Sequence, residues 1–133
     1  MWTHGTSVQV QENGWGALRE GKHTTVTPGN GPSKGWVHFA IPTPVVVDGA
    51  PLKARTALVR FRLGPQTSII NFQVWNANQY PAIYDQGGSY TNPIEVTLTN
   101  QPDLIGGIGI SFRVDFAGAG AWIELFGAGI RFS

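Results

Sequence analysis

Apolar and polar side chains alternate at every second position in four segments of this chain, and no other sequence feature restricts its fold as strongly. The segments are residues 57–63, 68–76, 93–99 and 107–116. In the last of them, the apolar side chains run from Ile108 to Phe116. Successive side chains of an extended backbone point to opposite faces, so each segment would have one apolar and one polar face. The pattern predicts antiparallel strands whose apolar faces meet in one core.

The alternation also predicts which side chains face outward. In residues 57–63, Arg60 and Arg62 share the outer face. In residues 68–76, the predicted core side chains are Ile70, Phe72 and Val74, and the outer ones are Asn71, Gln73 and Trp75. Beyond residue 126 the alternation changes phase at residues 127–129, which read Gly-Ala-Gly. That change predicts a bulge or a close approach of another part of the chain.

The rest of the chain also favours short strands separated by turns. Shorter apolar segments predict further strands at residues 6–11, 15–18, 23–27, 36–41 and 44–47. Turn pairs such as Asn13-Gly14 and Asp48-Gly49 separate them. Roughly nine or ten such strands are too many for one small sheet. We therefore predict an all-β fold, one domain over residues 1–133, built as an antiparallel two-sheet, jelly-roll-like sandwich, with a closed β-barrel as the alternative.

The last two predicted strands suggest a hairpin. Residues 117–120 would form its type II′ turn, with Gly118 and Ala119 as the two-residue loop. The register would then place Phe112 opposite Leu125 in the core, and Arg113 opposite Glu124 on the outer face. Because one register matches both an apolar pair and an ion pair, we predict that these strands are neighbours in one sheet.

Few charges are available to cover the surface of this domain. Charged residues make up 13% of the chain, and the formal net charge is +1, whereas globular proteins average about 25% charged residues. A nucleic-acid-binding protein would concentrate positive charge on one face, so we expect no nucleic-acid partner. A weakly charged surface in a chain with five tryptophans favours a subunit interface, and hence a homo-oligomer.

Other sequence observations concern the cellular location. The chain has no cysteine, which excludes disulfides and thiolate metal sites. The first five residues, Met1-Trp2-Thr3-His4-Gly5, have neither the basic nor the apolar region of a signal peptide. No apolar segment reaches the ~18 residues that a membrane span needs. We expect a cytoplasmic location without a membrane span, with leaderless export as the alternative.

Two segments in the first half of the chain resemble a group of known proteins. One is Met1-Trp2-Thr3-His4-Gly5 followed by residues 8–12, and the other is residues 36–49, which include Ile41-Pro42-Thr43-Pro44 and Val47-Asp48-Gly49. They resemble small, mainly bacterial all-β proteins without an assigned activity, in which a MWxHG start and an IPTPVxVDG segment recur. The resemblance implies a compact β domain and no catalytic residues.

Side chains that carry catalysis or metal chemistry are scattered along the sequence. His4, His23 and His38 show no local spacing typical of metal ligands, although distant strands could bring them together. There is no nucleophile elbow, and Ser111 lies in the middle of a predicted strand. Glu124 is explained more simply as an ion-pair partner than as a glycosidase carboxylate. We therefore predict no catalytic residue, no metal site and no cofactor, and the sequence favours a binding protein over an enzyme.

One loop mixes aromatic and amide side chains after a predicted strand. Sugar sites use this mixture, because an aromatic ring covers the apolar face of a sugar while amides and carboxylates bind its hydroxyl groups. The predicted ligand-binding residues are Trp75, Asn76, Asn78, Tyr80, Tyr84 and Asp85. The alternative is that the rings are core or interface residues and the amides form turns.

Three functions stay open at this point. The first is a non-enzymatic binding and assembly module, an oligomeric β-sandwich with a lectin-like loop site for glycans. The second is a purely structural, self-assembling subunit whose outer face, with Arg60, Arg62 and Trp75, meets a neighbouring copy. The third is a small enzyme that acts on a hydrophobic substrate in a β cavity of at least ~300 Å³, with His38 or Glu124 as acid or base.

Overall fold

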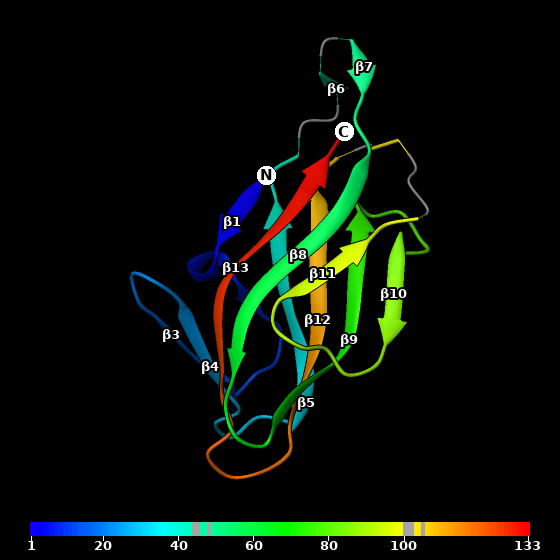
Figure 1. Cartoon of the computed structure of the whole chain (residues 1–133). Coiled ribbons are helices and arrows are strands. Elements are labelled where there is room, and N and C mark those ends of the chain that lie inside the picture. Colours follow the sequence, from blue (N-terminus) through cyan, green and yellow to red (C-terminus); the bar gives the residue numbers. More distant parts are fainter. Residues whose placement is uncertain (44–45, 48, 100–102, 105) are drawn as a thin grey trace.

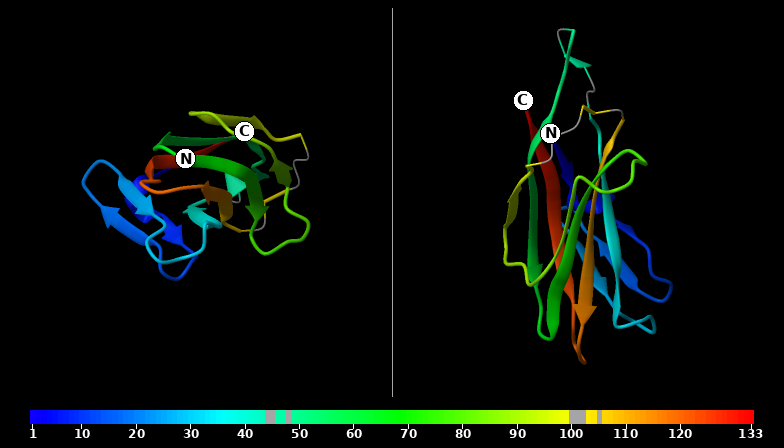
Figure 2. Two further views of the ribbon diagram at one scale, coloured as in Figure 1. Left: turned by 90° about the horizontal axis from the view of Figure 1, so that it is seen from below. Right: turned by 90° about the vertical axis from the view of Figure 1, so that its right-hand side faces the viewer.

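The strands form two antiparallel sheets that face each other (Figures 1 and 2). The computed structural model describes residues 1–43, 46–47, 49–99, 103–104 and 106–133. Sheet A contains, in spatial order, β11 (Ile94–Thr97), β8 (Ala54–Leu63), β13 (Ile123–Phe132), β4 (Thr24–Thr27) and β3 (Gly16–Arg19), and β1 (Trp2–His4) also pairs with β13. Sheet B contains β10 (Tyr84–Gly87), β9 (Thr67–Asn76), β12 (Ile108–Phe116), β5 (Lys34–Ile41) and β2 (Gln9–Val10). The predicted two-sheet sandwich is confirmed, and it is open rather than closed into a barrel.

Two small elements stand apart from these sheets. The strands β6 (Val46–Val47) and β7 (Ala50–Pro51) pair only with each other, at one end of the sandwich (Figure 1). The predicted strand at residues 44–47 lies partly outside the described residues. Turn η1 (Gly5–Ser7) is a single turn of 3-10 helix. The described part of the chain has no α-helix, and no helix in it is long and apolar enough to cross a membrane.

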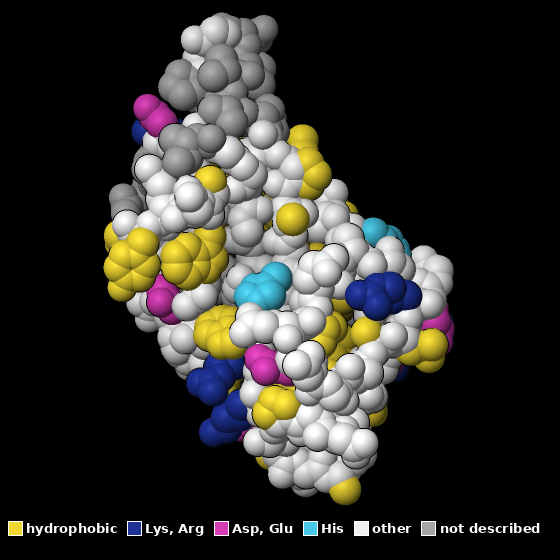
Figure 3. Space-filling view, turned by 180° about the vertical axis from the view of Figure 1, so that it is seen from behind, with side chains coloured by type: hydrophobic (Ala, Val, Ile, Leu, Met, Phe, Trp, Pro, Cys, Tyr) yellow, Lys and Arg dark blue, Asp and Glu magenta, His cyan; other side chains and the backbone are white. Residues whose placement is uncertain are grey.

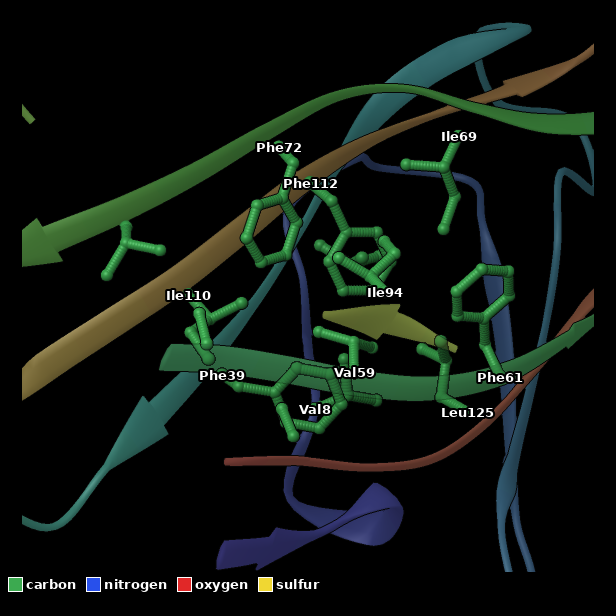
Figure 4. Packing of buried hydrophobic residues seen from close by; sticks show 14 of the residues in the cluster. Val8, Phe39, Val59, Phe61, Ile69, Phe72, Ile94, Ile110, Phe112 and Leu125 are labelled. Atoms are coloured by element: carbon green, nitrogen blue, oxygen red, sulfur yellow. The ribbon is translucent and has the colours of Figure 1, made fainter. Parts of the chain in front are cut away.

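The apolar faces of the two sheets meet in one core (Figure 4). The predicted core side chains of β12 are all buried, and Phe72 and Val74 of β9 are fully buried as well. Ile70 is an exception, because Ile69 is buried in its place. The register between β9 and β12 shifts at this point, so a β-bulge inserts one residue and moves the alternation by one position.

The predicted hairpin of the last two strands is wrong. Strand β12 lies in sheet B between β5 and β9, whereas β13 lies in sheet A between β8 and β4. Phe112 and Leu125 both face the core, but from different sheets. Arg113 therefore does not meet Glu124, and Glu124 pairs with Arg62 of β8 instead.

The connections at one end of the sandwich explain this error. Alternation determines which face a side chain takes, but it does not determine which strand is the neighbour. Residues 117–122 can cross the ~10 Å between two packed sheets, and they hydrogen-bond to the β8–β9 connection. The N–H of Ala117 donates to the carbonyl of Gln66 at 2.7 Å, and the N–H of Gly64 donates to the carbonyl of Trp122 at 2.9 Å. Two cross-sheet connections thus replace the hairpin turn.

The predicted strand at residues 6–11 is shorter in the structure, because turn η1 occupies its start. Gly5 lies so close to β13 that a Cβ there would be 1.9 Å from the carbonyl oxygen of Leu125. The Nδ1 atom of His4 caps the turn by accepting the backbone N–H of Thr6 at 3.2 Å. Strands β1, β7 and β10 were not predicted at all. The first five residues thus have a structural role, since they dock the start of the chain onto β13.

Candidate functional site

The outer face of sheet B carries mainly neutral polar side chains. One row across the strands consists of Asp85, Gln73, Ser111, His38 and Gln9. Figure 3 looks onto this side of the molecule, where hydrophobic side chains form separate patches among polar atoms. Such a surface offers hydrogen-bond donors and acceptors beside apolar area, which is the composition that small-molecule sites use.

The next row contains a tryptophan and two residues with almost no side chain. Trp75 of β9 has Gly109 of β12 as its register partner, and Gly109 has Ala40 of β5 on its other side. A Cβ at Gly109 would be 3.7 Å from the Cβ of Trp75. The half-buried Trp75 thus lies beside a part of the sheet surface that carries almost no side chain.

A hollow of about 410 Å³ lies at this bare part of the sheet. Its lining residues are Ala40, Ile41, Pro42, Ala77, Gly107, Ile108 and Gly109. This volume falls in the range of about 300–1,000 Å³ that is usual for ligand pockets. We call this feature the Trp75 hollow, because Trp75 adjoins Gly109 at its edge.

The orientation of the Trp75 indole is fixed by its neighbour on the same strand. The Nε1–H of Trp75 donates to Oε1 of Gln73 at 3.0 Å. The two side chains share the outer face because they are two positions apart on β9. The amide nitrogen of Gln73 faces the same outer surface as a donor, so an indole and an amide are presented together.

His38 is the centre of a hydrogen-bonded chain on this face. Its Nδ1 atom lies 2.6 Å from Oγ of Ser111, and its Nε2 atom lies 2.6 Å from Oε1 of Gln11. Because a carbonyl oxygen only accepts, the neutral ring donates from Nε2 to Gln11 and accepts the hydroxyl proton of Ser111 at Nδ1. Burial lowers the pKa of His38, and the negative charge of Glu12 opposes this shift. The neutral ring is therefore the form that this face favours near pH 7.

This chain of residues does not form a nucleophilic site. Ser111 is buried in the middle of β12, and its backbone lies between the paired strands β5 and β9. An acyl-transfer site needs free donors for the oxyanion and a group that stabilises the charged imidazole. Here the partner of the second ring nitrogen is the neutral amide of Gln11. The arrangement positions polar groups for hydrogen bonding and supplies no route to a covalent intermediate.

The structure separates the six residues predicted to bind a ligand. Asn76 is only 1% exposed, and its amide donates to the carbonyl of Asp103 at 3.0 Å and to Oε1 of Gln79 at 3.3 Å. Asn76 has the same parity as Phe72 and Val74, so it points inward with them. Its amide groups hold the loop after β9 and do not face a ligand.

Tyr84 also lies on the inner side of sheet B. Its register partner is the buried Val74, and its ring packs edge-on against Phe72 with the centroids 6.0 Å apart. Burial and a hydrogen bond with Tyr84 raise the pKa of the neighbouring Tyr90 to about 12. The alternative interpretation of the aromatic residues as core residues is thus correct for Tyr84.

The other four predicted residues lie at the surface. Trp75 and Asp85 are on the outer face of sheet B, where Trp75 is two positions from Gln73 along β9 and Asp85 is the register partner of Gln73 on β10. Asn78 and Tyr80 are exposed on the loop after β9, and Tyr80 is 88% exposed. This loop reaches the Trp75 hollow through Ala77. The side chains of these four residues are thus not used in the core, unlike those of Asn76 and Tyr84.

The three histidines lie apart from one another. His38 is on the outer face of sheet B, and His4 caps turn η1. The Nε2 atom of His23 lies 3.7 Å from Oε2 of Glu124, on the side of sheet A. Within the described residues, no group of three or more His, Cys, Asp or Glu side chains could hold a metal ion.

Two functional hypotheses lose their geometric basis. Arg60 and Arg62 lie on the outer face of sheet A, and Trp75 lies on the outer face of sheet B, so no single face contains all three. His38 and Glu124 likewise lie on opposite outer faces and not in an internal cavity. A shared assembly face is therefore ruled out for Arg60, Arg62 and Trp75, and neither His38 nor Glu124 lies on an inner sheet face, where a cavity between the sheets would be.

Several residues of the Trp75 hollow were not predicted from the sequence. Gln73 could have been found, because it shares the parity of Trp75 on one strand. Gly109 and Ala40 could not, because their position beside Trp75 depends on the pairing of β12 with both β9 and β5. The hollow is a product of sheet order, which local periodicity does not reveal.

Comparisons with other proteins agree with this fold. A protein family described as a family of unknown function (DUF6623) matches residues 1–133. No curated protein sequence matches this chain. A solved structure of the carbohydrate-binding module CBM36 in complex with calcium and xylotriose has a TM-score of 0.52 and 8% identity, and the match covers 98% of this chain and 99% of that one. The likeness to this module supports the same sandwich fold.

Two further solved structures are more distant. One is a CBM4 structure, with a TM-score of 0.47, 16% identity, and coverage of 90% of this chain and 94% of that chain. The other is a Paenibacillus cycloisomaltooligosaccharide glucanotransferase complexed with cycloisomaltoheptaose, with a TM-score of 0.45 and 17% identity. The match to it covers 98% of this chain but 18% of that one. Neither adds to the assignment of the fold.

Proposed function

We propose that this chain, which belongs to the DUF6623 family, is a non-enzymatic saccharide-binding module whose binding face is the outer face of sheet B. The observation that carries the proposal is the Trp75 hollow. An oriented indole adjoins a bare glycine and alanine surface, and neutral hydrogen-bonding side chains form the next row. This arrangement suits a neutral sugar ring, whose apolar C–H face would cover the indole while its hydroxyl groups meet amides.

The contacts proposed for the ligand come from two parts of the chain. Trp75 and Gln73 would hold the sugar on the sheet, and Asp85 would accept from its hydroxyl groups. Asn78 and Tyr80 would contact it from the loop that borders the hollow. The hydrogen bonds of the neutral side chains Gln73, Asn78 and Tyr80 would contribute only about 0.5–1.5 kcal/mol each, and that of the exposed Asp85 is weakened by water. The indole therefore supplies the largest single contribution.

Calcium is not part of this proposal. The solved module with the same fold is described in complex with calcium and xylotriose. Calcium takes about six to eight oxygen ligands, with carboxylates prominent among them. The described residues contain no group of three or more acidic, histidine or cysteine side chains that could hold such an ion. The proposed sugar contacts therefore involve side chains alone.

Binding of neutral oligosaccharides tests this proposal. Xylotriose serves as the first probe, followed by an array of neutral glycans, with affinities measured by calorimetry. Trp75→Ala should lower the affinity by about fivefold to tenfold, because an aromatic contact contributes up to about 1.5 kcal/mol. Gln73→Ala should have a smaller effect, of about threefold.

Trp122→Ala is the matched control, because Trp122 is a half-buried tryptophan that directly precedes β13 and lies beside Arg62 of sheet A. It should leave the affinity unchanged. Failure of every neutral glycan to bind would refute the proposal, and so would an unchanged affinity in Trp75→Ala.

A further inference from the structure

The outer face of sheet A carries a second surface with different chemistry. Three adjoining hollows of about 530, 290 and 270 Å³ all have Arg60 among their lining residues. The largest is lined by Arg60, Asn92, Pro93 and Phe126, and the others add Trp2, Met1, Leu58, Ile130 and Arg131. We call this surface the Arg60 groove. It lies on the opposite side of the sandwich from the Trp75 hollow.

A tryptophan lies flat along one side of the Arg60 groove. A Cβ at Gly127 would be 2.6 Å from Nε1 of Trp2, and a Cβ at Gly129 would be 2.3 Å from Cε3 of the same ring. The register of β13 shifts between Leu125 and Gly127, so the bulge lies at Phe126, one position before residues 127–129 where it was predicted. Two glycines and a bulge thus make room for an indole that is still 47% exposed.

Arg60 differs from two neighbouring arginines of this face. Arg62 pairs with Glu124, and Arg131 pairs with Glu95 at 2.8 Å. Among the described residues, Arg60 has no carboxylate partner, and its guanidinium group lies over the ring of Trp2, 5.9 Å from the centroid. The charge of Arg60 is therefore available to an anion, because an aromatic ring does not neutralise it.

The polar side chains of the largest hollow are donors. Oδ1 of Asn92 accepts the backbone N–H of Phe61 at 3.1 Å, which leaves its amide N–H groups as donors. The guanidinium of Arg60 also only donates. No carboxylate lines any of the three hollows within the described part of the chain. A ligand of this groove must therefore bring acceptors, and preferably a negative charge.

We infer that the Arg60 groove binds an acidic saccharide, with the carboxylate of a uronate residue on Arg60 and the apolar part of a sugar ring against the exposed parts of Trp2 and Phe126. A guanidinium binds a carboxylate through two parallel hydrogen bonds, which a neutral sugar cannot form. The exposed Trp2 and the half-buried Phe126 line the same hollow as Arg60, so they offer apolar ring surface to a sugar next to the carboxylate. Because the three hollows share Arg60, they adjoin one another around its guanidinium. The inference does not depend on binding at the Trp75 hollow.

Trigalacturonate and galactotriose test this inference, because each unit of trigalacturonate carries a carboxylate and galactotriose carries none. Calorimetry should show that the protein binds trigalacturonate and that galactotriose binds at least about tenfold more weakly at this groove. Arg60→Gln should lower the affinity for trigalacturonate by about tenfold or more. Phe126→Ala keeps every charge and should lower it by about threefold to fivefold.

Arg62→Gln is the matched control, because Arg62 lies on the same face and strand but is paired with Glu124. It should change the affinity by less than about twofold. Absence of trigalacturonate binding, or equal losses in Arg60→Gln and Arg62→Gln, would overturn the inference. Competition by sodium sulfate at the same concentration as trigalacturonate would also overturn it, because the groove would then bind small anions in general.

Trp75→Ala separates this inference from the proposed function. It should leave trigalacturonate binding at the wild-type value, while Arg60→Gln should leave xylotriose binding unchanged. Loss of trigalacturonate binding in Trp75→Ala would place the acidic sugar at the Trp75 hollow and would contradict the inference. Unfolding curves of Arg60→Gln and Phe126→Ala that match the wild type would show that changes in affinity report on the groove itself.

Discussion

The two outer faces of the sandwich come from the same alternation of side chains but differ in their chemistry. On sheet A, arginines lie against indoles: Arg60 over Trp2 and Arg62 over Trp122, at 5.9 and 5.1 Å from the ring centroids. On sheet B, the interactions of Trp75 and His38 are hydrogen bonds with neutral side chains. One face thus presents positive charge beside aromatic rings, and the other presents neutral donors and acceptors beside an open hollow.

This difference shows why a β-sandwich can hold two unrelated sites. The core fixes the inner side chains of both sheets, whereas the outer positions are free to vary without loss of packing. Glycines have different tasks on the two faces. Gly127 and Gly129 on sheet A are covered by the ring of Trp2, while Gly109 on sheet B is left open and forms part of a hollow.

The largest expected effect comes from replacing a glycine on each face. In Gly129→Ala the new Cβ would be 2.3 Å from the ring of Trp2 and 2.9 Å from the carbonyl oxygen of Met1. The free energy of unfolding, measured in urea, should therefore fall by about 1–3 kcal/mol, as in other overpacked sites. Gly109→Ala makes only ordinary contacts and should change it by less than about 1 kcal/mol. Equal losses in both variants would contradict this contrast.

A second comparison concerns two ion pairs on sheet A. The side chain of Glu124 is 13% exposed and meets both Arg62 and His23, whereas that of Glu95 is 51% exposed and meets Arg131. Glu124→Gln should lower the free energy of unfolding by about 1 kcal/mol, and Glu95→Gln by less than about 0.5 kcal/mol. Added salt should reduce the effect of both substitutions. An equal cost for the two would show that burial does not matter here.

The smallest effect is a dependence of stability on pH that arises on sheet B. Because burial lowers the pKa of His38 in the folded protein, the unfolded chain binds a proton first as the pH falls. Stability from this group is therefore complete above pH 6.5 and is lost as the pH falls from there through the lowered pKa. In His38→Gln, the free energy of unfolding measured in urea should change less between pH 7 and pH 5 than in the wild type. The difference between the two proteins should be under about 1 kcal/mol, because water screens the half-buried ring.

Glu12→Gln is a second test of the pH dependence that arises from His38. The charge of Glu12 raises the pKa of His38, so its removal should lower that pKa further and make the loss of stability steeper. Glutamine can still accept the backbone N–H of Trp36, which Oε1 of Glu12 accepts at 3.3 Å. A smaller pH dependence in Glu12→Gln than in the wild type would show that another group is responsible.

The alternation of side chains predicted the two-sheet fold and the buried faces of most strands, but not which strands are neighbours. The inner and outer positions of β8, β11 and β12 follow directly from alternation, because burial at every second residue is a local property. The partners of β12 and β13 do not, and matched pairs such as Phe112 with Leu125 occur by chance when two strands face the same core. A bulge at Ile70 is equally invisible, since Ile69 and Ile70 are both apolar.

The candidate site shows the same limit of local information. Asn76 could have been placed inward, since it continues the parity of Phe72 and Val74. The Trp75 hollow and the Arg60 groove could not be predicted, because each joins side chains from strands far apart in the sequence. A homo-oligomer and a cytoplasmic location stay predictions, and the mass of the protein in solution at high concentration tests the first of them.

The central claim is that the two faces bind different saccharides, and the indole N–H signals of the five tryptophans test it in one NMR experiment. Trp2→Phe and Trp75→Phe assign the two signals that matter. Xylotriose should shift the signal of Trp75 and leave that of Trp2 in place, whereas trigalacturonate should shift Trp2 and leave Trp75 in place. Shifts of the same tryptophan by both sugars, or of neither by either sugar, would contradict the account.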